Sequence, residues 1–280
     1  MAHPQIAAFA RLAKENATPT RLLAGQKTLL SRTMHDIRYD AVHDEILVTN
    51  PFAAAIVVFR GGANGEEAPI RVIQGSNTQL QGTGGVAPAA DRLDVDPGHN
   101  EIFIPAGDRI LVYPRTGNGD VAPLRVIRGP DTTLRRAQAI AVDPVQNVIV
   151  VGTNVAYQNG MGALLIFNRT DNGNVRPRGV ILGPKSGLGS LNQILIYSPK
   201  GWIVAAQTGD SYGILEPEGV FLGVWSIHDN GDVPPRWKLA GPRSTIKKPR
   251  GVALSPKDKE LIIADMRLNA VLTYYFPEIF

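Results

Sequence analysis

The stretch Ala139–Gly183 reads AIAVDPVQNVIVVGTNVAYQNGMGALLIFNRTDNGNVRPRGVILG and contains short runs of β-forming residues separated by turn residues. The first run, residues 139–143, alternates small and branched side chains and is followed by a proline. The second run, residues 148–151, consists of Val and Ile alone, and the third is residues 163–167. Such runs, bounded by Pro, Asn and Gly, predict three successive β-strands.

The end of this stretch predicts a hairpin and an edge strand. Asp171-Asn-Gly173 supplies residues that tolerate the positive φ of a tight hairpin. A fourth run extends from Pro177 to Leu182, and Gly183 then lets the chain turn away. Because Pro lacks a backbone donor, it suits the edge of a sheet rather than its centre. Four antiparallel strands with the Pro-bearing strand outermost describe a propeller blade.

The same unit recurs along the chain. Its aromatic residue recurs after 54, 54 and 58 residues, and an Asn-Gly pair, a Pro and a Gly recur at the same intervals. The positions are Phe59, Tyr113, Phe167 and Trp225; Asn64, Asn118, Asn172 and Asn230; Pro69, Pro123, Pro177 and Pro235; and Gly75, Gly129, Gly183 and Gly241. A repeat of this length indicates one supersecondary unit stacked beside its copies.

Five copies of the innermost strand predict the number of blades. They begin near Asp36, Arg92, Ala139, Gln193 and Gly251. We therefore predict a single all-β domain over residues 1–280, a five-bladed β-propeller of four-stranded antiparallel blades, with six blades as the alternative. The last copy lacks a fourth strand, and residues 20–24 offer one. Pairing the N- and C-terminal strands in one blade would leave no open sheet edge between them.

Residues 1–16 are left over by this assignment. Ile6–Ala10 matches the third-strand position, which the C-terminal residues 271–275 already fill. We expect an extra N-terminal strand, or a helix with Ile6, Phe9 and Leu12 on one face. We also expect a monomer, with a strand-swapped dimer as the alternative.

The strand sequences resemble the NHL-type propeller repeat and its bacterial relatives. The resemblance rests on Gly251-Val-Ala-Leu, on Ala139-Ile-Ala-Val-Asp-Pro, and on Glu101-Ile-Phe-Ile followed by Arg109-Ile-Leu-Val-Tyr. It covers nearly the whole chain. NHL propellers usually have six blades, so five inner strands depart from the family pattern. The resemblance implies a propeller but not one function, because the group includes protein-binding and RNA-binding modules, lyases and lactonase-like hydrolases.

The amino-acid composition excludes or disfavours several classes of protein. The chain has 280 residues, 44% of them hydrophobic, and no cysteine, so disulfides and thiolate chemistry are excluded. No apolar stretch approaches the roughly 20 residues of a membrane span, and no secretory leader is recognised. We expect a soluble protein of unknown location, with a trimmed secreted protein as one alternative. The basic residues behind the net charge of +4 are spread over the repeats, which argues against a nucleic-acid partner.

The innermost strands turn every second side chain towards the central channel. These positions are Asp36 and Arg38, Arg92 and Asp94, Ala139 and Ala141, Gln193 and Leu195, and Gly251 and Ala253. Four of them are charged, and buried charges are normally paired. Asp36 with Arg92, or Arg38 with Asp94, would form ion pairs that fill the channel. The functional alternative is a polar pocket for an anion or a small polar ligand.

The residues preceding the inner strands form a second candidate set at the channel mouth. They are His35, Asp91, Gln138, Asn192 and Arg250. Convergent polar groups of this kind orient ligands, although solvated loops show them too. His35 is the candidate base, oriented by Asp36 or Asp91, because imidazole exchanges protons near neutral pH.

Two long loops, residues 153–162 and 208–219, should stand beside the mouth and carry Tyr157 and Tyr212 as candidate binding residues. No cofactor is predicted. A divalent metal would need Asp36 and Asp94 as ligands, and the neighbouring arginines argue against a cation.

These residues favour a non-catalytic propeller scaffold that binds a protein, peptide or small polar ligand on the channel-mouth face. The alternative is a lyase- or lactonase-like hydrolase that works in the channel, with His35 as base and Arg92 or Arg38 stabilising an oxyanion. Whether the protein is an enzyme is left open by the sequence.

Overall fold

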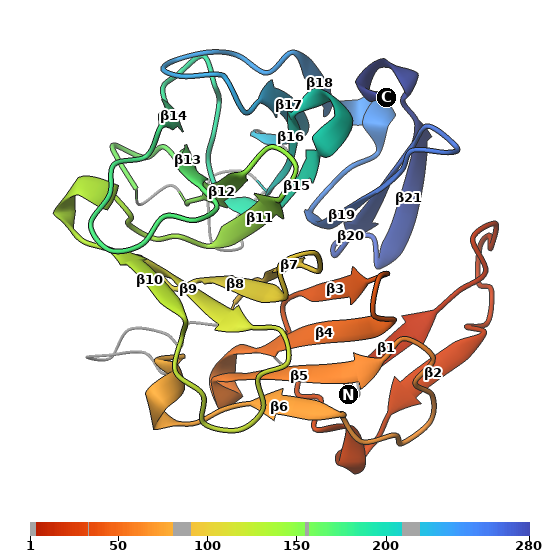
Figure 1. Cartoon of the computed structure of the whole chain (residues 1–280). Coiled ribbons are helices and arrows are strands. Elements are labelled where there is room, and N and C mark those ends of the chain that lie inside the picture. The colour runs from red at the N-terminus through yellow and green to blue at the C-terminus, as the bar shows by residue number, and fades with distance from the viewer. Residues whose placement is uncertain (1–3, 33, 81–90, 155–156, 209–218) are drawn as a thin grey trace. The chain divides into compact units, whose positions relative to one another are not determined.

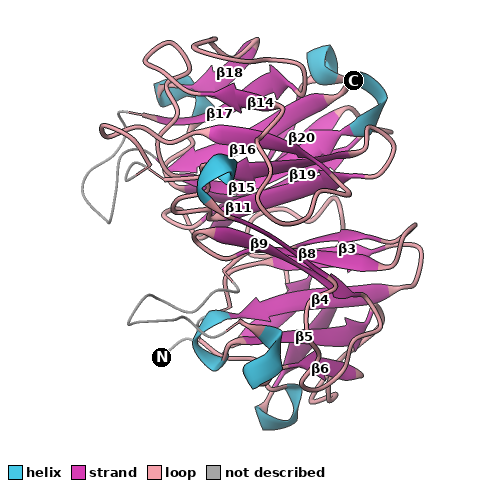
Figure 2. Cartoon of the chain, turned by 60° about the vertical axis from the view of Figure 1, so that its left-hand side comes forward, coloured by secondary structure: helices cyan, strands magenta, loops and turns pink. Residues whose placement is uncertain are grey.

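The computed structural model describes residues 4–32, 34–80, 91–154, 157–208 and 219–280. β-strands dominate, joined by turns and by single-turn 3-10 helices (Figures 1 and 2). The helices are η1 (Gln26–Thr28), η2 (Pro51–Ala53), η3 (Ser76–Thr78), η4 (Pro130–Thr132), η5 (Ser198–Lys200), η6 (Pro242–Ser244) and η7 (Pro277–Ile279).

Five antiparallel sheets follow one another along the chain, each with its strands in sequence order. The first contains β3 (Ile37–Asp40), β4 (Glu45–Asn50), β5 (Ala55–Arg60) and β6 (Arg71–Ile73). The second contains β7 (Asp94–Asp96), β8 (Glu101–Pro105), β9 (Arg109–Pro114) and β10 (Arg125–Arg128). The third contains β11 (Ala139–Asp143), β12 (Val148–Gly152), β13 (Leu164–Asn168) and β14 (Gly179–Ile181). The fourth contains β15 (Leu191–Tyr197), β16 (Trp202–Thr208), β17 (Val220–Ser226) and β18 (Trp237–Ala240). The fifth contains β19 (Pro249–Ser255), β20 (Glu260–Asp265) and β21 (Ala270–Tyr275).

The protein is an all-β, five-bladed β-propeller, as the five inner strands predict. The first strands of neighbouring sheets contact one another, β3 with β7, β11 with β15 and β15 with β19. Their counterparts at the outer side are the short fourth strands, each preceded by a recurring Pro. The six-bladed alternative is not found among the described residues.

Two compact units make up the chain. One comprises residues 1–102 and 112–124, and the other comprises residues 103–111 and 125–280. Each is described by itself below, and the interpretation of residues 1–280 as one domain stays a prediction.

The sheets form where β-branched and aromatic residues are buried on both faces. In the third sheet, all five residues of β12 are buried, and Ile149 pairs with Phe167 of β13. Strands that are covered on both sides read as continuous apolar runs rather than as alternating ones. The recurring aromatic residues Phe59, Tyr113, Phe167 and Trp225 are all fully buried, so the predicted repeat marks the packed core.

The N-terminal residues form a separate hairpin. Strand β1 (Gln5–Ala8) pairs antiparallel with β2 (Arg21–Ala24) over four residue pairs, so residues 5–8 form a strand outside the five larger sheets. In the first unit β2 is the partner of β1, and in the second unit β21 is the last of three strands, so the sharing of one blade by residues 20–24 and the C-terminal strand stays a prediction. In the first three of the four-stranded sheets, the third strand pairs with one edge of the fourth strand and the Asn-Gly pair of the following copy covers the other edge. β1 pairs with the edge of β2 that corresponds to the third-strand edge.

Neighbouring copies are joined by a contact that we call the Asn clasp. The side-chain oxygen of each recurring Asn accepts a hydrogen bond from a backbone N–H in the preceding fourth strand. The pairs are Asn64 with Leu22 (3.0 Å), Asn118 with Val72 (2.9 Å), Asn172 with Val126 (3.1 Å) and Asn230 with Val180 (2.9 Å). The Gly that follows each Asn adds a backbone bond to the same residue, which covers the outer edge of that strand.

A turn after each fourth strand also recurs. In Gly75-Ser-Asn-Thr78-Gln-Leu80, the Thr78 hydroxyl donates to the Gly75 carbonyl (2.6 Å) and accepts from the Leu80 N–H (3.2 Å). The same bonds join Gly25, Thr28 and Leu30; Gly129, Thr132 and Leu134; Gly183, Ser186 and Leu188; and Gly241, Ser244 and Ile246. Five copies of this turn agree with five blades.

Candidate functional site

The predicted site residues of the first two blades lie together in the first unit. We call them the His35 cluster, which comprises His35, Asp36, Arg38, Thr49, Asp91, Arg92 and Asp94. Thr49, at the end of β4, holds the cluster together. Its hydroxyl accepts a hydrogen bond from the Asp36 N–H (3.0 Å) and donates one to the Asp91 carbonyl (3.1 Å).

Arg38 lies between two carboxylates. Its Nε donates to Oδ1 of Asp94 (3.1 Å), and its guanidinium lies 3.5 Å from Oδ1 of Asp36. Burial alone would lower the pKa of Arg38, but the charges of Asp36 and Asp94 raise it above its ordinary value. The predicted Arg38–Asp94 ion pair is therefore present.

Asp36 also joins two first strands. Its Oδ2 accepts a hydrogen bond from the Leu93 N–H (3.1 Å), next to β7, and its side chain is only 2% exposed. A buried carboxylate that accepts a backbone bond and faces a guanidinium is well satisfied. The buried charge of Asp36 is therefore explained by its structural role in linking the two strands.

The solvent-facing end of the cluster is His35 with Asp91. Nδ1 of His35 is in contact with Oδ1 of Asp91, and the two side chains are 41% and 30% exposed. Asp91 also lies 3.4 Å from Arg92, whose side chain is 2% exposed and donates to the Asp91 carbonyl (3.0 Å). The contact of the carboxylate with Nδ1 orients the imidazole ring of His35.

The geometry around Asp36 and Asp94 does not favour a cation. Arg38 already places a positive charge beside both carboxylates, where a metal ion would have to sit. Among the described residues, no group of three or more His, Asp or Glu side chains could hold a metal ion.

The second unit contains another polar group, the Asn192 cluster, which comprises Asn192, Gln193, Thr208 and Arg250. Arg250 donates to Oδ1 of Asn192 (2.8 Å), and Nδ2 of Asn192 donates to the Thr208 hydroxyl (2.7 Å). Oε1 of Gln193 accepts from the Val252 N–H (2.5 Å). Gln193 therefore links β15 to β19 as Asp36 links its strand to the neighbouring blade.

The other predicted binding residues are less closely grouped. Gln138 accepts a long hydrogen bond from Asn154 (3.4 Å), and the Tyr157 hydroxyl donates to Thr133 (3.3 Å). Tyr212 lies outside the described residues. Thr49 and Thr208 were not singled out from the sequence, since a Thr at the end of a strand is too common to mark a site.

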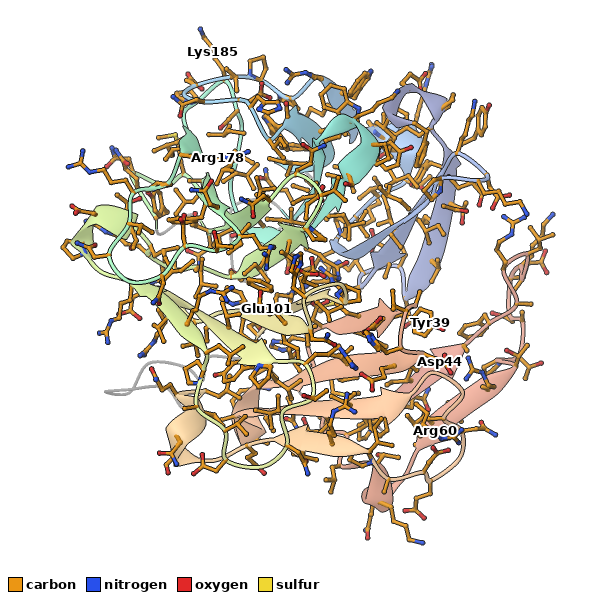
Figure 3. The ribbon with its side chains drawn as sticks, in the orientation of Figure 1. Tyr39, Asp44, Arg60, Glu101, Arg178 and Lys185 are labelled. Atoms are coloured by element: carbon orange, nitrogen blue, oxygen red, sulfur yellow. The ribbon has the colours of Figure 1, made fainter. Side chains whose placement is uncertain are left out.

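A polar group on the surface of the first unit includes Tyr39, Asp44 and Arg60, all labelled in Figure 3. The Tyr39 hydroxyl donates to Asp44 (2.8 Å), and this hydrogen bond raises the pKa of Tyr39. Arg60 forms two hydrogen bonds with Glu67 (2.7 and 2.8 Å). Each of these side chains has a hydrogen-bond partner nearby in the chain, so we interpret the group as stabilising the turns that carry it.

No model of a known protein family matches the chain, and no curated protein matches its sequence. The resemblance to the NHL repeat thus stays a prediction, while the propeller rests on the sheets themselves. None of the described helices is long and apolar enough to cross a membrane.

Proposed function

We propose that this protein is a non-catalytic propeller scaffold, related to bacterial NHL-type propellers, that binds a peptide segment or another polar ligand at the ends of its first strands. The observation that carries the proposal is that arginines at the ends of the first strands are bound by neighbouring side chains. Arg38 is held between Asp36 and Asp94, and Arg250 is held by Asn192. Their donors position neighbouring strands, which suits a rigid binding surface.

The exposed pair His35–Asp91 supplies the ligand-reading groups in the first unit. It combines a donor or acceptor nitrogen with a carboxylate, on a base made rigid by Thr49. A few convergent polar groups on a pre-formed scaffold are what orients a ligand.

A phage-displayed library of random dodecapeptides tests the proposal. Peptides selected on the wild-type protein should bind the double variant His35→Ala/Asp91→Ala at least about tenfold more weakly, the equivalent of 1.4 kcal/mol. The matched control is Arg60→Ala/Glu67→Ala, which removes another exposed ion pair of the same unit. Equal affinity for the two double variants would contradict binding at this pair, and failure to enrich any peptide would contradict a peptide as the ligand.

One observation favours the second candidate, a lactonase-like hydrolase. Asp91 contacts Nδ1 of His35, as an orienting carboxylate does for a general base. Neither Arg38 nor Arg92 is exposed enough to meet an oxyanion freely. Hydrolysis of γ-butyrolactone, followed in a pH-stat, distinguishes the two functions. Turnover that falls about 10²-fold or more in His35→Gln would favour the hydrolase and count against the scaffold.

A further inference from the structure

Five Asn-Gly pairs occur in the chain, at residues 64–65, 118–119, 159–160, 172–173 and 230–231. Four of them belong to the Asn clasp, and the pair at residues 159–160 lies in the loop between β12 and β13. An asparagine followed by glycine is readily attacked by the backbone nitrogen of that glycine, because glycine has no Cβ to hinder the approach. The reactivity of the five pairs can therefore be compared within one molecule.

The reaction at such a pair consumes only water. The backbone nitrogen of the glycine loses its proton and attacks Cγ of the asparagine side chain, so that a C–N bond forms and ammonia leaves. The product is a cyclic succinimide. Water then opens the ring at either of its carbonyls and gives aspartate or isoaspartate, and in isoaspartate the main chain runs through the former side chain. Either product carries a negative charge that the amide lacks.

Closure of the succinimide ring requires two movements. The asparagine side chain must turn its Cγ towards the glycine nitrogen, and the glycine N–H must lose its proton while its peptide plane rotates. A hydrogen bond to the side-chain oxygen opposes the first movement, and a hydrogen bond from the glycine N–H opposes the second. The hydrogen bonds at each pair therefore indicate how fast it reacts.

The Asn clasp restrains both of these groups. Oδ1 of Asn118 accepts a hydrogen bond from the Val72 N–H (2.9 Å), and the Gly119 N–H donates to the Val72 carbonyl (2.6 Å). The corresponding N–H bonds of the other clasps are 2.8 Å at Gly65, 2.8 Å at Gly173 and 2.7 Å at Gly231. Both partners of every clasp belong to the same compact unit.

The pair Asn159-Gly160 is held differently. It forms a two-residue turn, in which Gln158 and Met161 exchange two backbone hydrogen bonds (3.2 and 2.8 Å). Asn159 has φ 49° and Gly160 has φ 79°, the positive values that a type I′ turn requires. The peptide between the two central residues takes no part in the hydrogen bonds of such a turn. Among the described residues of the second unit, neither the Asn159 side chain nor the Gly160 N–H forms a hydrogen bond.

We propose that Asn159 is a site of spontaneous deamidation through a succinimide, and that the Asn clasp protects the other four Asn-Gly pairs from the same reaction. Isoaspartate at this position adds a methylene group to the main chain, so the two bonds between Gln158 and Met161 cannot both keep the geometry of a two-residue turn. The loop between β12 and β13 therefore changes irreversibly in shape and charge. This modification does not depend on the proposed ligand-binding function.

Peptide mapping of the intact protein tests the proposal, because trypsin places the five pairs in five different peptides. The folded protein is kept in mildly alkaline buffer at physiological temperature. The aspartate and isoaspartate forms of each peptide are then followed over time by liquid chromatography and mass spectrometry. We expect Asn159 to react at least about tenfold faster than any clasped pair, since opening a clasp breaks two hydrogen bonds. A rate at Asn159 no higher than that of the clasped pairs would overturn the proposal.

The protein unfolded in guanidinium chloride is the matched control, and it needs no substitution. Without the clasp, the four pairs have the same local chemistry as Asn159-Gly160, so their rates should rise towards the rate at Asn159. Clasped pairs that react as slowly in the unfolded protein as in the folded one would show that their neighbours in sequence protect them, which would overturn the role of the clasp.

One variant opens a single clasp. Val180→Pro removes the N–H that binds Asn230, on the side of β14 that faces away from β13. Asn230 should then react about fivefold faster, the equivalent of one net hydrogen bond. Asn172, whose clasp with Val126 is untouched, should keep its rate. An unchanged rate at Asn230, in a variant whose circular dichroism spectrum matches that of the wild type, would overturn the protective role of the clasp.

Discussion

Glu45 lies between two arginines at the start of β4. Its Oε2 accepts hydrogen bonds from Arg71 and from Arg115, both at 2.6 Å, and Arg115 also donates to Asn100 (2.9 Å). Burial alone would raise the pKa of Glu45, but the two guanidinium groups lower it below its ordinary value. One carboxylate therefore connects the first sheet to the segment after β9.

The first prediction follows from this carboxylate. Glu45→Gln should lower the free energy of unfolding at pH 7 by about 2 kcal/mol, because two charge-assisted hydrogen bonds lose their anion. The folded-state pKa lies below the unfolded value of about 4.3, so the contribution is complete above that pH and is lost as the pH falls through the folded-state pKa. Urea unfolding at pH 7 and near pH 3 measures it. A difference between wild type and variant that stays constant between these pH values would count against the ion pair.

At the scale of elements, the Asn clasp ties β2, β6, β10 and β14 each to the following copy. Asn118→Ala should destabilise the protein by about 1 kcal/mol, the net value of one hydrogen bond. Its exchange signature is more specific, because the Val72 amide loses its acceptor and should exchange faster while Ile73 keeps its bonds to β5. Arg176→Ala, an exposed change on another loop, is the control. Unchanged exchange at Val72 would contradict the clasp.

The turn after the fourth strand depends on one glycine. Gly75 has φ 144° and ψ 177°, a region open to glycine almost alone. A Cβ there would lie 2.3 Å from the carboxylate of Asp120, which accepts a hydrogen bond from the Asn77 N–H (2.7 Å). Gly75→Ala should therefore cost about 3 kcal/mol, measured by urea unfolding. Adding Asp120→Ala should relieve the clash but not the backbone strain, so full recovery in the double variant would contradict this account.

For the whole molecule, the repeat was sufficient to predict the fold class and the number of blades. The period placed Phe59, Tyr113, Phe167 and Trp225 in the core, where they are buried. The Asn-Gly pairs were interpreted as hairpin turns alone, and their second role could not be foreseen, because the strand that each one binds lies 42 to 50 residues away. The pairing of β1 with residues 20–24 was not predicted, for another reason. Residues 6–10 and 271–275 both match the third-strand position, and the pattern does not rank them.

The sequence predicted which side chains lie close together in the candidate site, but not the backbone groups to which they are hydrogen-bonded. Strand alternation placed Arg38 and Asp94 on one side, and they pair. It could not show that Asp36 and Gln193 accept hydrogen bonds from backbone N–H groups of the neighbouring blade, because every residue except Pro carries such a group and the sequence does not reveal its partner. Whether these residues bind a ligand stays a prediction.

A repeat held by nearest-neighbour contacts predicts additive energetics. Asn172→Ala and Asn230→Ala remove clasps in successive copies of the second unit. Their double variant should lose the sum of the single losses within about 0.5 kcal/mol. Guanidinium unfolding of the four proteins in the cycle measures this. A coupling of 1 kcal/mol or more would show that the copies communicate beyond their contacts.

The Asn clasp joins residues of adjoining copies, and this has a consequence for how such a chain can arise. A segment one period long, cut at any point of the repeat, carries one Asn-Gly pair and one strand for such a pair to hold. Tandem duplication of the corresponding gene segment therefore inserts a copy whose contacts on both sides are already matched. The ancestry of the protein need not follow the boundaries of its sheets.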